Sequence, residues 1–503
     1  MIVLSLLLLV ITLFIIFVKK KQNYWRDRNV PQMNPAFLFG NLINVMLKKE
    51  NFQTLLNRMY NNHPNSRYEG VYQAILPTLL IKDPELLKQM IVKDFDHFMD
   101  HHLFVPRRDP LWGRNLVALN GKAWQDMRST LSPAFTSSKL KCMFPLMSEC
   151  AEKFIDYFLK MNKTVVSIEL KEEFSRFAND VIATCAFGVS CNTIEERTNI
   201  FMEMGKRVSV LPSFKFFGTA LFPGLFHKLG ITLFDPEVGD FFKNIVMETI
   251  KVREEQRIER PDMIHLLMQA KAGILDGDGD KPPKTAIKNE DIVGQVLIFF
   301  LAGFDSISTQ MTFSAYELAL NQDVQDKVFA EIVDGLERND QKIDYEMIQS
   351  LKYLDMVMME SLRKWPATGG GDRLCVKDYK IPAKLPGEKD IIIEKGTPIW
   401  LPISAINRDP KYFPDPDRFD PERFSEANKD KIVAGTLLAF GFGPRACIGS
   451  RFAIMEMKIM LVNLLKTFKL VKVDKTQDVI KLSSKSLNNV MDGGHWIGLQ
   501  RRN

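Results

Sequence analysis

The pattern of hydrophobic and polar positions divides the chain into an apolar N-terminal segment and a long body of mixed pattern. Residues 2–18 are almost all apolar, and Lys19–Lys21 follow them directly. About 17–25 such residues span a bilayer as a helix, and the thin membrane of the endoplasmic reticulum suits a short span. A cleaved signal peptide would need positive charge before the run and a small-residue cleavage site after it, and neither is present. We therefore predict a single-pass anchor over residues 1–21, with the rest of the chain on the cytoplasmic side.

The body that follows the anchor begins with an irregular stretch. Pro31, Pro35 and Gly40 cannot continue a helix, so residues 22–40 are expected to form a proline-containing hinge. Residues 68–82 then predict a pair of strands.

Beyond the strands, the patterns are mainly helical. Asp83-Pro84 has N-cap chemistry and predicts the start of a helix. Residues 120–365 have mostly helical periodicity, whereas the last third mixes short helices, strands and proline-rich loops. The sequence has no internal repeat and no clear linker between separate cores. We predict an α+β fold, mainly α with small β-sheets, in one catalytic domain over residues 22–503.

The longest helical pattern, residues 289–321, predicts a buried central helix. At 1.5 Å per residue it would be about 50 Å long, enough to cross a domain of this size. Gly303, Asp305 and Ser306 stand in its middle, and glycine and serine weaken a helix locally. An acid beside hydroxyls offers protons a route through water, although small residues also suit plain helix packing. Thr309 lies one turn later, and we expect its hydroxyl to point elsewhere.

Composition and charge agree with a globular body. Of the 503 residues, 46% are hydrophobic and 25% are charged, which excludes both a disordered chain and a wholly membrane-embedded one. The formal net charge of +6 is too diffuse to indicate nucleic-acid binding. The six cysteines form no C-x-x-C motif, which favours free thiols in a reducing compartment over a zinc site.

One cysteine stands in an unusual frame, "FGFGPRACIG", over residues 440–449. The glycines allow sharp turns and the close approach of another surface. Arg445 precedes Cys447 by two positions, and a neighbouring cation favours a thiolate over a thiol. The stretch therefore looks built to present one sulfur anion.

A carboxylate and two arginines predict a structural lock near this cysteine. Glu360 and Arg363 are three residues apart, so they lie on one helical face. Arg423 follows in a proline-rich loop just upstream of the cysteine. A glutamate that bridges both arginines would hold this loop against the helix.

Two further segments have alternative interpretations. Residues 211–234 are rich in Phe and Leu but are interrupted by prolines and glycines. Ordinary packing and a mobile apolar flap that touches the membrane are both open for this segment. Asp276, Asp278 and Asp280 alternate as in a calcium loop, but Ile287 stands where that loop needs glutamate. We expect a solvated connector there.

Four motifs stand in order along the chain: "AGFDS", "ESLR", "PERF" and "FGFGPRACIG". Together with the anchor they resemble those of the cytochrome P450 haem-thiolate monooxygenases, and the likeness covers nearly the whole chain. The stretches "WQDMRSTLSPAFTSSKLKCM" and "RPDMIHLLMQAK" are most similar to insect microsomal members, many of which oxidise xenobiotics. The resemblance implies the cytochrome P450 fold, with its long central helix over the haem.

The resemblance also implies a set of site residues. Haem b would be held through its iron by the Cys447 thiolate, an axial ligand that favours O–O cleavage. The residues expected to bind the cofactor are Cys447, Arg445, Trp124, Arg128, His101 and Phe440. The residues expected to act in catalysis are Asp305 and Ser306.

Two positions depart from the family's pattern. In the family, the acid of the central helix is usually followed by threonine, and here Ser306 follows Asp305. We expect oxygen activation to survive, with more reduced oxygen escaping as peroxide. Many relatives place an arginine for a haem propionate where this chain has His101 and His102, and Arg373 is another candidate for that role. The glycines at 369–371 are expected to lie beside the haem and leave the pocket roomy.

The implied reaction inserts one atom of O2 into a lipophilic small molecule. NADPH–cytochrome P450 reductase would supply the electrons, with cytochrome b5 as a further candidate donor, and the candidate docking cations are Lys122, Lys139, Lys141 and Arg451. The implied location is the endoplasmic reticulum membrane, and no nucleic-acid partner is expected. One alternative is an NADPH-independent hydroperoxide isomerase or dehydratase on the same fold. Another is a non-enzymatic, membrane-tethered binder of haem or hydrophobic molecules. Asp305 and Ser306 argue against both.

Overall fold

The computed structural model describes residues 2–102, 109, 111–209, 213–221, 223–273, 287–486 and 489–502. Most of these residues are helical and the strands are short, as the α+β prediction requires. The helices are α1 (Ile2–Gln22), α2 (Tyr24–Asp27), α3 (Ile43–Met46), α4 (Phe52–Asn61), α5 (Pro84–Lys88), α6 (Gly121–Leu131), α7 (Ser137–Lys160), α8 (Leu170–Ile182), α9 (Ile200–Ser209), α10 (Ser213–Leu221), α11 (Pro223–Lys228), α12 (Pro236–Gln256), α13 (Met263–Ala272), α14 (Asn289–Leu301), α15 (Ser308–Leu320), α16 (Gln322–Arg338), α17 (Tyr345–Ser350), α18 (Lys352–Lys364), α19 (Ile403–Ile406) and α20 (Ser450–Thr467). The strands are β1 (Tyr68–Gln73), β2 (Leu76–Ile81), β3 (Val165–Glu169), β4 (Gly371–Leu374), β5 (Tyr379–Ile381), β6 (Ile391–Ile393), β7 (Pro398–Leu401), β8 (Phe468–Val471) and β9 (Trp496–Arg501).

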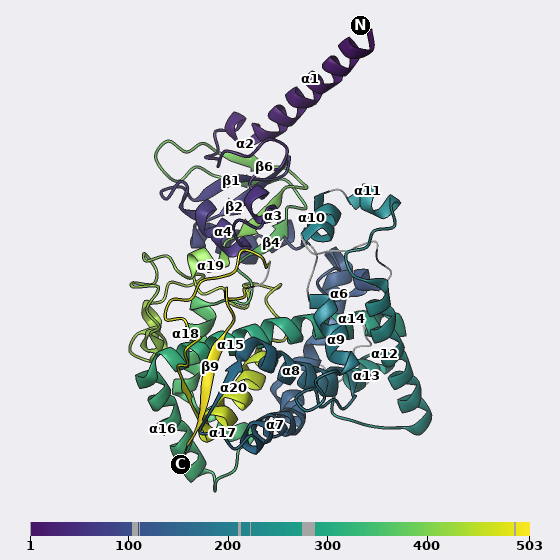
Figure 1. Cartoon of the computed structure of the whole chain (residues 1–503). Helices are drawn as coiled ribbons and strands as arrows, with labels where there is room; N and C mark the ends of the chain where they lie inside the picture. The colour runs from purple at the N-terminus through teal and green to yellow at the C-terminus, as the bar shows by residue number, and fades with distance from the viewer. Residues whose placement is uncertain are drawn as a thin grey trace.

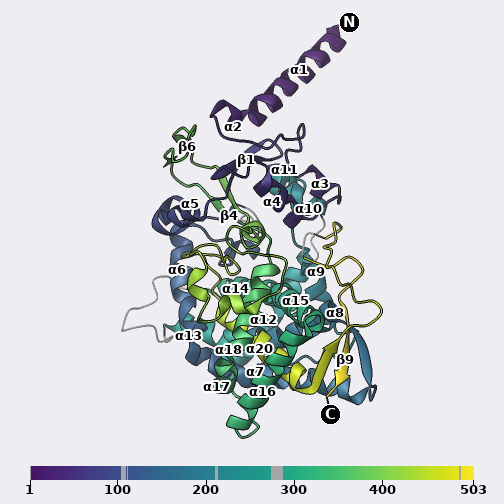
Figure 2. The same cartoon turned by 90° about the vertical axis from the view of Figure 1, so that its left-hand side faces the viewer.

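Three small sheets accompany the helical body. The largest has the strand order β1-β2-β7-β4, and β2 runs parallel to β7 with Leu79 opposite Ile399. The second sheet has the order β3-β9-β8, and β5 pairs with β6 in the third. Figures 1 and 2 show the first sheet near the inner end of α1, whereas β9 lies toward the other end of the molecule. The helical body lies below the first sheet in both views.

The first part of the body forms the elements that its sequence predicts. β1 and β2 are the expected antiparallel pair. Asp83 accepts a hydrogen bond from Glu85 N and caps α5, as expected for a residue directly before a proline at the helix start. Residues 22–40, expected to form a hinge, contain α2 and run beside β1, where Trp25 is fully buried.

The predicted central helix is present, but its middle is interrupted. α14 and α15 flank a π-helical segment, Ala302–Ile307, and Figure 1 shows this long helix crossing the body. The Ser306 hydroxyl donates to Ala302 O, and the Ser308 hydroxyl donates to Phe304 O at 2.6 Å. Such side-chain bonds compete with the regular helical ladder. The small polar residues therefore account for the local opening.

The described part of the Phe-rich segment forms two short helices, α10 and α11, and α10 contacts α3. Phe217 and Phe226 are buried, whereas Leu225 and Leu229 are 55% and 62% exposed. The segment is thus partly packed and partly an apolar surface. The aspartates of the calcium-like loop lie outside the described residues: Asp276, Asp278 and Asp280.

Candidate functional site

The loop of residues 440–449 holds Cys447 in a defined position. Gly443 has a φ angle of +74°, which glycine adopts without strain. A Cβ atom at this position would lie 2.4 Å from Ile91 O, so a larger residue does not fit. Cys447 N donates to Phe440 O at 2.8 Å, which closes the loop before α20 begins.

Cys447 is exposed as a residue, although protein atoms surround its thiol on most sides. Burial raises the pKa of the Cys447 thiol, while the Gly449 N–H and the Arg128 guanidinium act against this rise. The cation that acts on the sulfur is therefore Arg128 of α6, rather than Arg445 as the sequence suggested. The Arg128 guanidinium and the Gly449 N–H are thus the groups of this chain that favour the thiolate form.

Arg445 is enclosed by backbone carbonyls and an aromatic ring. Its guanidinium donates to Met99 O at 2.7 Å and to Leu119 O at 2.8 Å. It also lies 4.1 Å from the centre of the Trp124 ring. Burial, together with repulsion from Arg373, lowers the pKa of Arg445 to about 9. The charges that act on one another here are three guanidinium groups, of Arg128, Arg373 and Arg445, and two carboxylates, of Asp100 and Asp372.

Arg373 on β4 is the second member of this positive region. It is 4% exposed, and its Nε atom has no hydrogen-bond partner among the residues that the structure describes. Its Nη1 donates to Asp372 O at 2.6 Å. His101 Nδ1 lies 3.1 Å from Asp372 Oδ1, so His101 reaches this region through the Asp372 carboxylate.

Arg128, Arg373 and Arg445 provide a test of whether the site fits the cofactor that the resemblance implies. Haem has two propionate carboxylates on one edge. These groups would fill the open Arg373 donor and offset the excess positive charge, because carboxylates pair strongly with buried guanidinium groups. Cys447 meanwhile presents the single sulfur ligand that the iron needs. The residues present therefore fit haem.

The acid of the central helix is held by a lysine that the sequence did not single out. Lys171, at the start of α8, donates from Nζ to Asp305 Oδ1 at 2.9 Å. It also donates to the Ser308 hydroxyl at 2.8 Å and to the Thr309 hydroxyl at 2.7 Å. The Thr309 hydroxyl thus faces α8 and shares the Lys171 ammonium group with Asp305. No sequence signal marks Lys171, because it precedes Asp305 by 134 residues.

The two sides of the π-helical segment differ in packing. A Cβ atom at Gly303 would lie 2.8 Å from Ile182 Cδ1, so this side is tightly packed. Ala302 is exposed, although Phe300 and Phe304 of the same helix are buried. The Ala302 side is therefore the one against which a ligand can lie.

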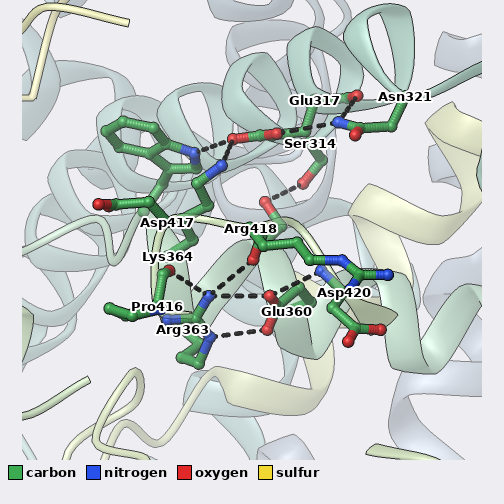
Figure 3. Close-up of polar contacts among 12 residues, drawn as sticks. Ser314, Glu317, Asn321, Glu360, Arg363, Lys364, Pro416, Asp417, Arg418 and Asp420 are labelled. Carbon is green, nitrogen blue, oxygen red and sulfur yellow. Dashed lines mark hydrogen bonds and ion pairs between the residues drawn. The ribbon is translucent and has the colours of Figure 1, made fainter. Parts of the chain in front are cut away.

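The predicted carboxylate lock is confirmed and lies between α18 and the loop before the cysteine (Figure 3). Glu360 accepts from Arg363 Nε at 2.7 Å and from Arg363 Nη2 at 2.8 Å, and both side chains are fully buried. Asp420 N donates to Glu360 at 2.9 Å, and Arg423 Nε lies 3.4 Å from it. Arg363 also donates to Pro416 O at 2.8 Å. The loop is thus bonded to both partners of the ion pair.

A second buried carboxylate, Glu317 of α15, was not found from the sequence. It accepts from Trp365 Nε1 at 2.6 Å and pairs with Lys364 Nζ at 2.8 Å. Figure 3 shows Glu317 bonded to Lys364 on one side and to Asn321 on the other. These contacts join the end of the central helix to the end of α18.

The glycines before Arg373 do not open the pocket. A Cβ atom at Gly370 would lie 2.5 Å from Leu56 Cδ1, and one at Gly369 would lie 3.0 Å from Gln53 Cβ. Both positions pack closely against α4. The expectation that this run leaves room was wrong at Gly369 and Gly370, because their missing side chains allow the close packing.

Comparison with known proteins gives one consistent family. Residues 30–491 match the family described as Cytochrome P450. The chain is 42% identical to Cytochrome P450 9e2 of Blattella germanica, over 95% of this chain and 94% of that protein. It is 38% identical to Probable cytochrome P450 9f2 of Drosophila melanogaster, over 98% of this chain and 97% of that protein. It is also 38% identical to Probable cytochrome P450 6a13 of the same organism, over 99% of this chain and all of that protein (100%).

Proposed function

The chain belongs to the cytochrome P450 family and is a haem-thiolate monooxygenase, and we propose that it oxidises lipophilic foreign compounds with electrons from NADPH–cytochrome P450 reductase. The observation that carries the proposal is the union of one presented sulfur, Cys447, with a buried excess of guanidinium charge. These are the two features needed to hold an iron macrocycle with acidic side groups. The similarity to insect relatives supports foreign compounds as the substrate class.

Each haem contact is assigned to a residue of this chain. Cys447 binds the iron, and Arg445 and Arg373 hold the carboxylates. Trp124 braces Arg445 through its ring, while Arg128 donates to Ala446 O at 3.0 Å and so fixes the cysteine loop. The two remaining residues act less directly. His101 orients Asp372, and Phe440 O accepts the Cys447 N–H at the start of the loop.

When bound, haem supplies the oxygen activation, and the protein supplies position and protons. Asp305 Oδ1, which Lys171 Nζ holds in place, takes up the protons. Ser306 Oγ passes them to the exposed Ala302 side of the helix. Ser306→Ala should therefore increase the hydrogen peroxide released per NADPH consumed. Unchanged coupling would mean that Ser306 only packs.

The electron donor is expected to dock on cations near the cysteine loop. Lys122 pairs with Asp126 and Lys141 pairs with Glu346, so part of their charge is already balanced. Lys139 and Arg451 have no ion-pair partner within the described ranges. These two cations are the better candidates for an acidic partner, whether it is the reductase or cytochrome b5.

The N-terminal helix supports an endoplasmic reticulum location. α1 has 21 residues with a mean hydropathy of 3.0 in its most apolar window, long enough to cross a thin bilayer. Lys19–Lys21 at its inner end support a catalytic domain on the cytoplasmic side, by the positive-inside rule.

Two measurements test the function. The reduced, carbon-monoxide-bound protein should show the red-shifted absorption band of thiolate-ligated haem, and Cys447→Ser should lose it. Persistence of the band in that variant would refute the ligand assignment. Turnover of a lipophilic panel should require both NADPH and reductase. Product formed without them would instead support the hydroperoxide isomerase alternative, and no product at all would favour a non-enzymatic binder.

A further inference from the structure

The last turn of α1 is bonded to the catalytic domain. Gln22 Nε2 donates to Ala36 O at 2.8 Å and lies 3.4 Å from Ala74 O, at the β1–β2 turn. Val18, the last apolar residue before the lysines, has no exposed surface. The domain therefore packs against α1 up to the edge of its apolar run.

Trp25 continues this attachment directly after α1. Its ring is fully buried, and a Cβ atom at Gly70 of β1 would lie 2.5 Å from Trp25 Cγ. Trp25 N donates to the Tyr72 hydroxyl at 3.2 Å, and that hydroxyl donates to Gln32 Oε1 at 2.8 Å. We call Gln22, Trp25, Gln32 and Tyr72 the anchor clasp. Because it joins α1 to a sheet strand by packing and by hydrogen bonds, it is suited to hold the helix at a set angle.

A short turn beside the clasp exposes two aromatic rings. Ala36 and Gly40 exchange backbone hydrogen bonds of 3.0 and 2.9 Å. Between them Phe37 and Phe39 are 46% and 43% exposed. Gly40 has a φ angle of +63°, and a Cβ atom there would lie 2.3 Å from Tyr72 O. The aromatic turn, residues 36–40, is therefore fixed against β1 at one end and against Gln22 at the other.

The depth of this turn follows from the helix geometry. Gln22 lies four residues beyond Val18, a rise of about 6 Å at 1.5 Å per residue. A bilayer of about 40–45 Å with a hydrocarbon core of about 30 Å leaves about 5–8 Å for each headgroup layer. Ala36 O bonds to Gln22, so the aromatic turn begins within the headgroup layer when α1 spans the membrane. Exposed aromatic rings are favoured at this depth.

Other exposed apolar residues lie at the same end of the molecule. Leu47 follows α3 and is 57% exposed, and Leu225 of α11 is 55% exposed. α3 contacts α10, and both figures show α3, α10 and α11 near the end from which α1 projects. Exposed apolar residues at the same end as a membrane-spanning helix favour lipid over a soluble partner.

We propose that the anchor clasp fixes the catalytic domain rigidly to α1, and that this rigid joint inserts Phe37 and Phe39 into the headgroup layer as a second lipid contact. The proposal rests on the membrane location given under the proposed function. A rigid joint, unlike a flexible tether, gives the domain a single tilt relative to the bilayer. The aromatic turn lies at a constant depth for the same reason.

The test uses the full-length protein in phospholipid nanodiscs, one copy per disc. An environment-sensitive fluorescent amino acid replaces Phe37, and spin-labelled lipid serves as the quencher. Ile258, which follows α12 and is 42% exposed, is the matched control position. We expect at least twofold more lipid quenching at position 37 than at position 258. Equal quenching would overturn the lipid contact. A blue shift at position 37 without lipid quenching would point to a second copy of the chain instead and would also overturn it.

The clasp is tested with the same probe in a Gln22→Ala, Trp25→Ala variant. This variant keeps α1 and so stays in the disc, but quenching at position 37 should fall by at least half because the domain can swing. Unchanged quenching would show that the clasp does not set the depth. The carbon monoxide spectrum reports whether the variant is folded, and Gln22→Ala alone serves as a milder second variant. No readout depends on turnover, and protein that fails to enter discs would refute the membrane location rather than the clasp.

Discussion

Replacement of Lys171 by methionine tests whether the contact between α8 and the central helix controls protons at the site. Methionine keeps a straight side chain of similar length but removes the ammonium group from Asp305 Oδ1 and from the Ser308 and Thr309 hydroxyls. The backbone change is small, because the Ser308 hydroxyl retains its bond to Phe304 O. The variant therefore isolates the charge.

The size of the effect follows from the burial of the pair. Charge-assisted hydrogen bonds contribute about 1.5–3 kcal/mol when buried, and exposed ion pairs about 0–1 kcal/mol. Lys171 and Asp305 are 17% and 26% exposed, which favours a value of about 1.5 kcal/mol. Since about 1.4 kcal/mol corresponds to a factor of ten, Asp305 should leave its bound position about ten times more often.

The assay measures product, NADPH and hydrogen peroxide together, in H2O and in D2O. A freely moving carboxylate admits water beside Ser306, so peroxide per NADPH should rise by about three- to tenfold, and the solvent isotope effect should fall. Lys206→Met is the matched control. It removes a lysine of α9 that pairs at 2.9 Å with Glu172 of α8, the helix that also carries Lys171. Equal coupling and equal isotope effects in the two variants would show that Lys171 has a structural role alone.

Three further predictions concern the surrounding structure. Glu360→Gln leaves the Arg363 guanidinium buried without a counter-charge and should cost about 3–5 kcal/mol of stability. Far less of the variant should then show the carbon monoxide band. A yield of band-forming protein equal to that of the native chain would refute this role. Arg373→Met removes a donor for a haem carboxylate and should speed haem transfer to excess apomyoglobin by about 10–100-fold, since a charge-assisted bond contributes about 1.5–3 kcal/mol; an unchanged half-time would contradict the assignment. Burial lowers the pKa of Lys82 to about 8. The folded chain therefore binds fewer protons than the unfolded chain between about pH 8 and 10.5. The free energy of unfolding should rise with pH in that window by about 3 kcal/mol relative to that of Lys82→Met. Parallel pH profiles of thermal unfolding for these two proteins would rule this out.

Some of the site could be predicted because the signal is local. Gly443 precedes Cys447 closely, and its positive φ angle is a property that glycine alone adopts without strain. Glu360 and Arg363 pair because three residues place them on one helical face. In both cases the spacing along the chain fixes the geometry before tertiary packing begins.

Other assignments failed because the contact partner is distant in sequence. The cation beside the sulfur is Arg128 rather than the adjacent Arg445, which turns to carbonyls and to Trp124. Arg445 is near in sequence, but packing directs its side chain elsewhere. The interpretation of Gly369 and Gly370 failed for the same reason, since α4 fills the space beside them.

The sequence by itself determined the apolar N-terminal helix, the helical class, the weak middle of the central helix and the cysteine loop, since each depends on a period or on a local backbone preference. The tertiary structure alone decided which charges distant in sequence meet. Lys171 reaches Asp305 across 134 residues, and Glu317 joins Lys364 across two helices. It also decided that residues 22–40 pack on β1 through Trp25. Local preferences act over a few residues, whereas ion pairs and burial depend on the path of the whole chain.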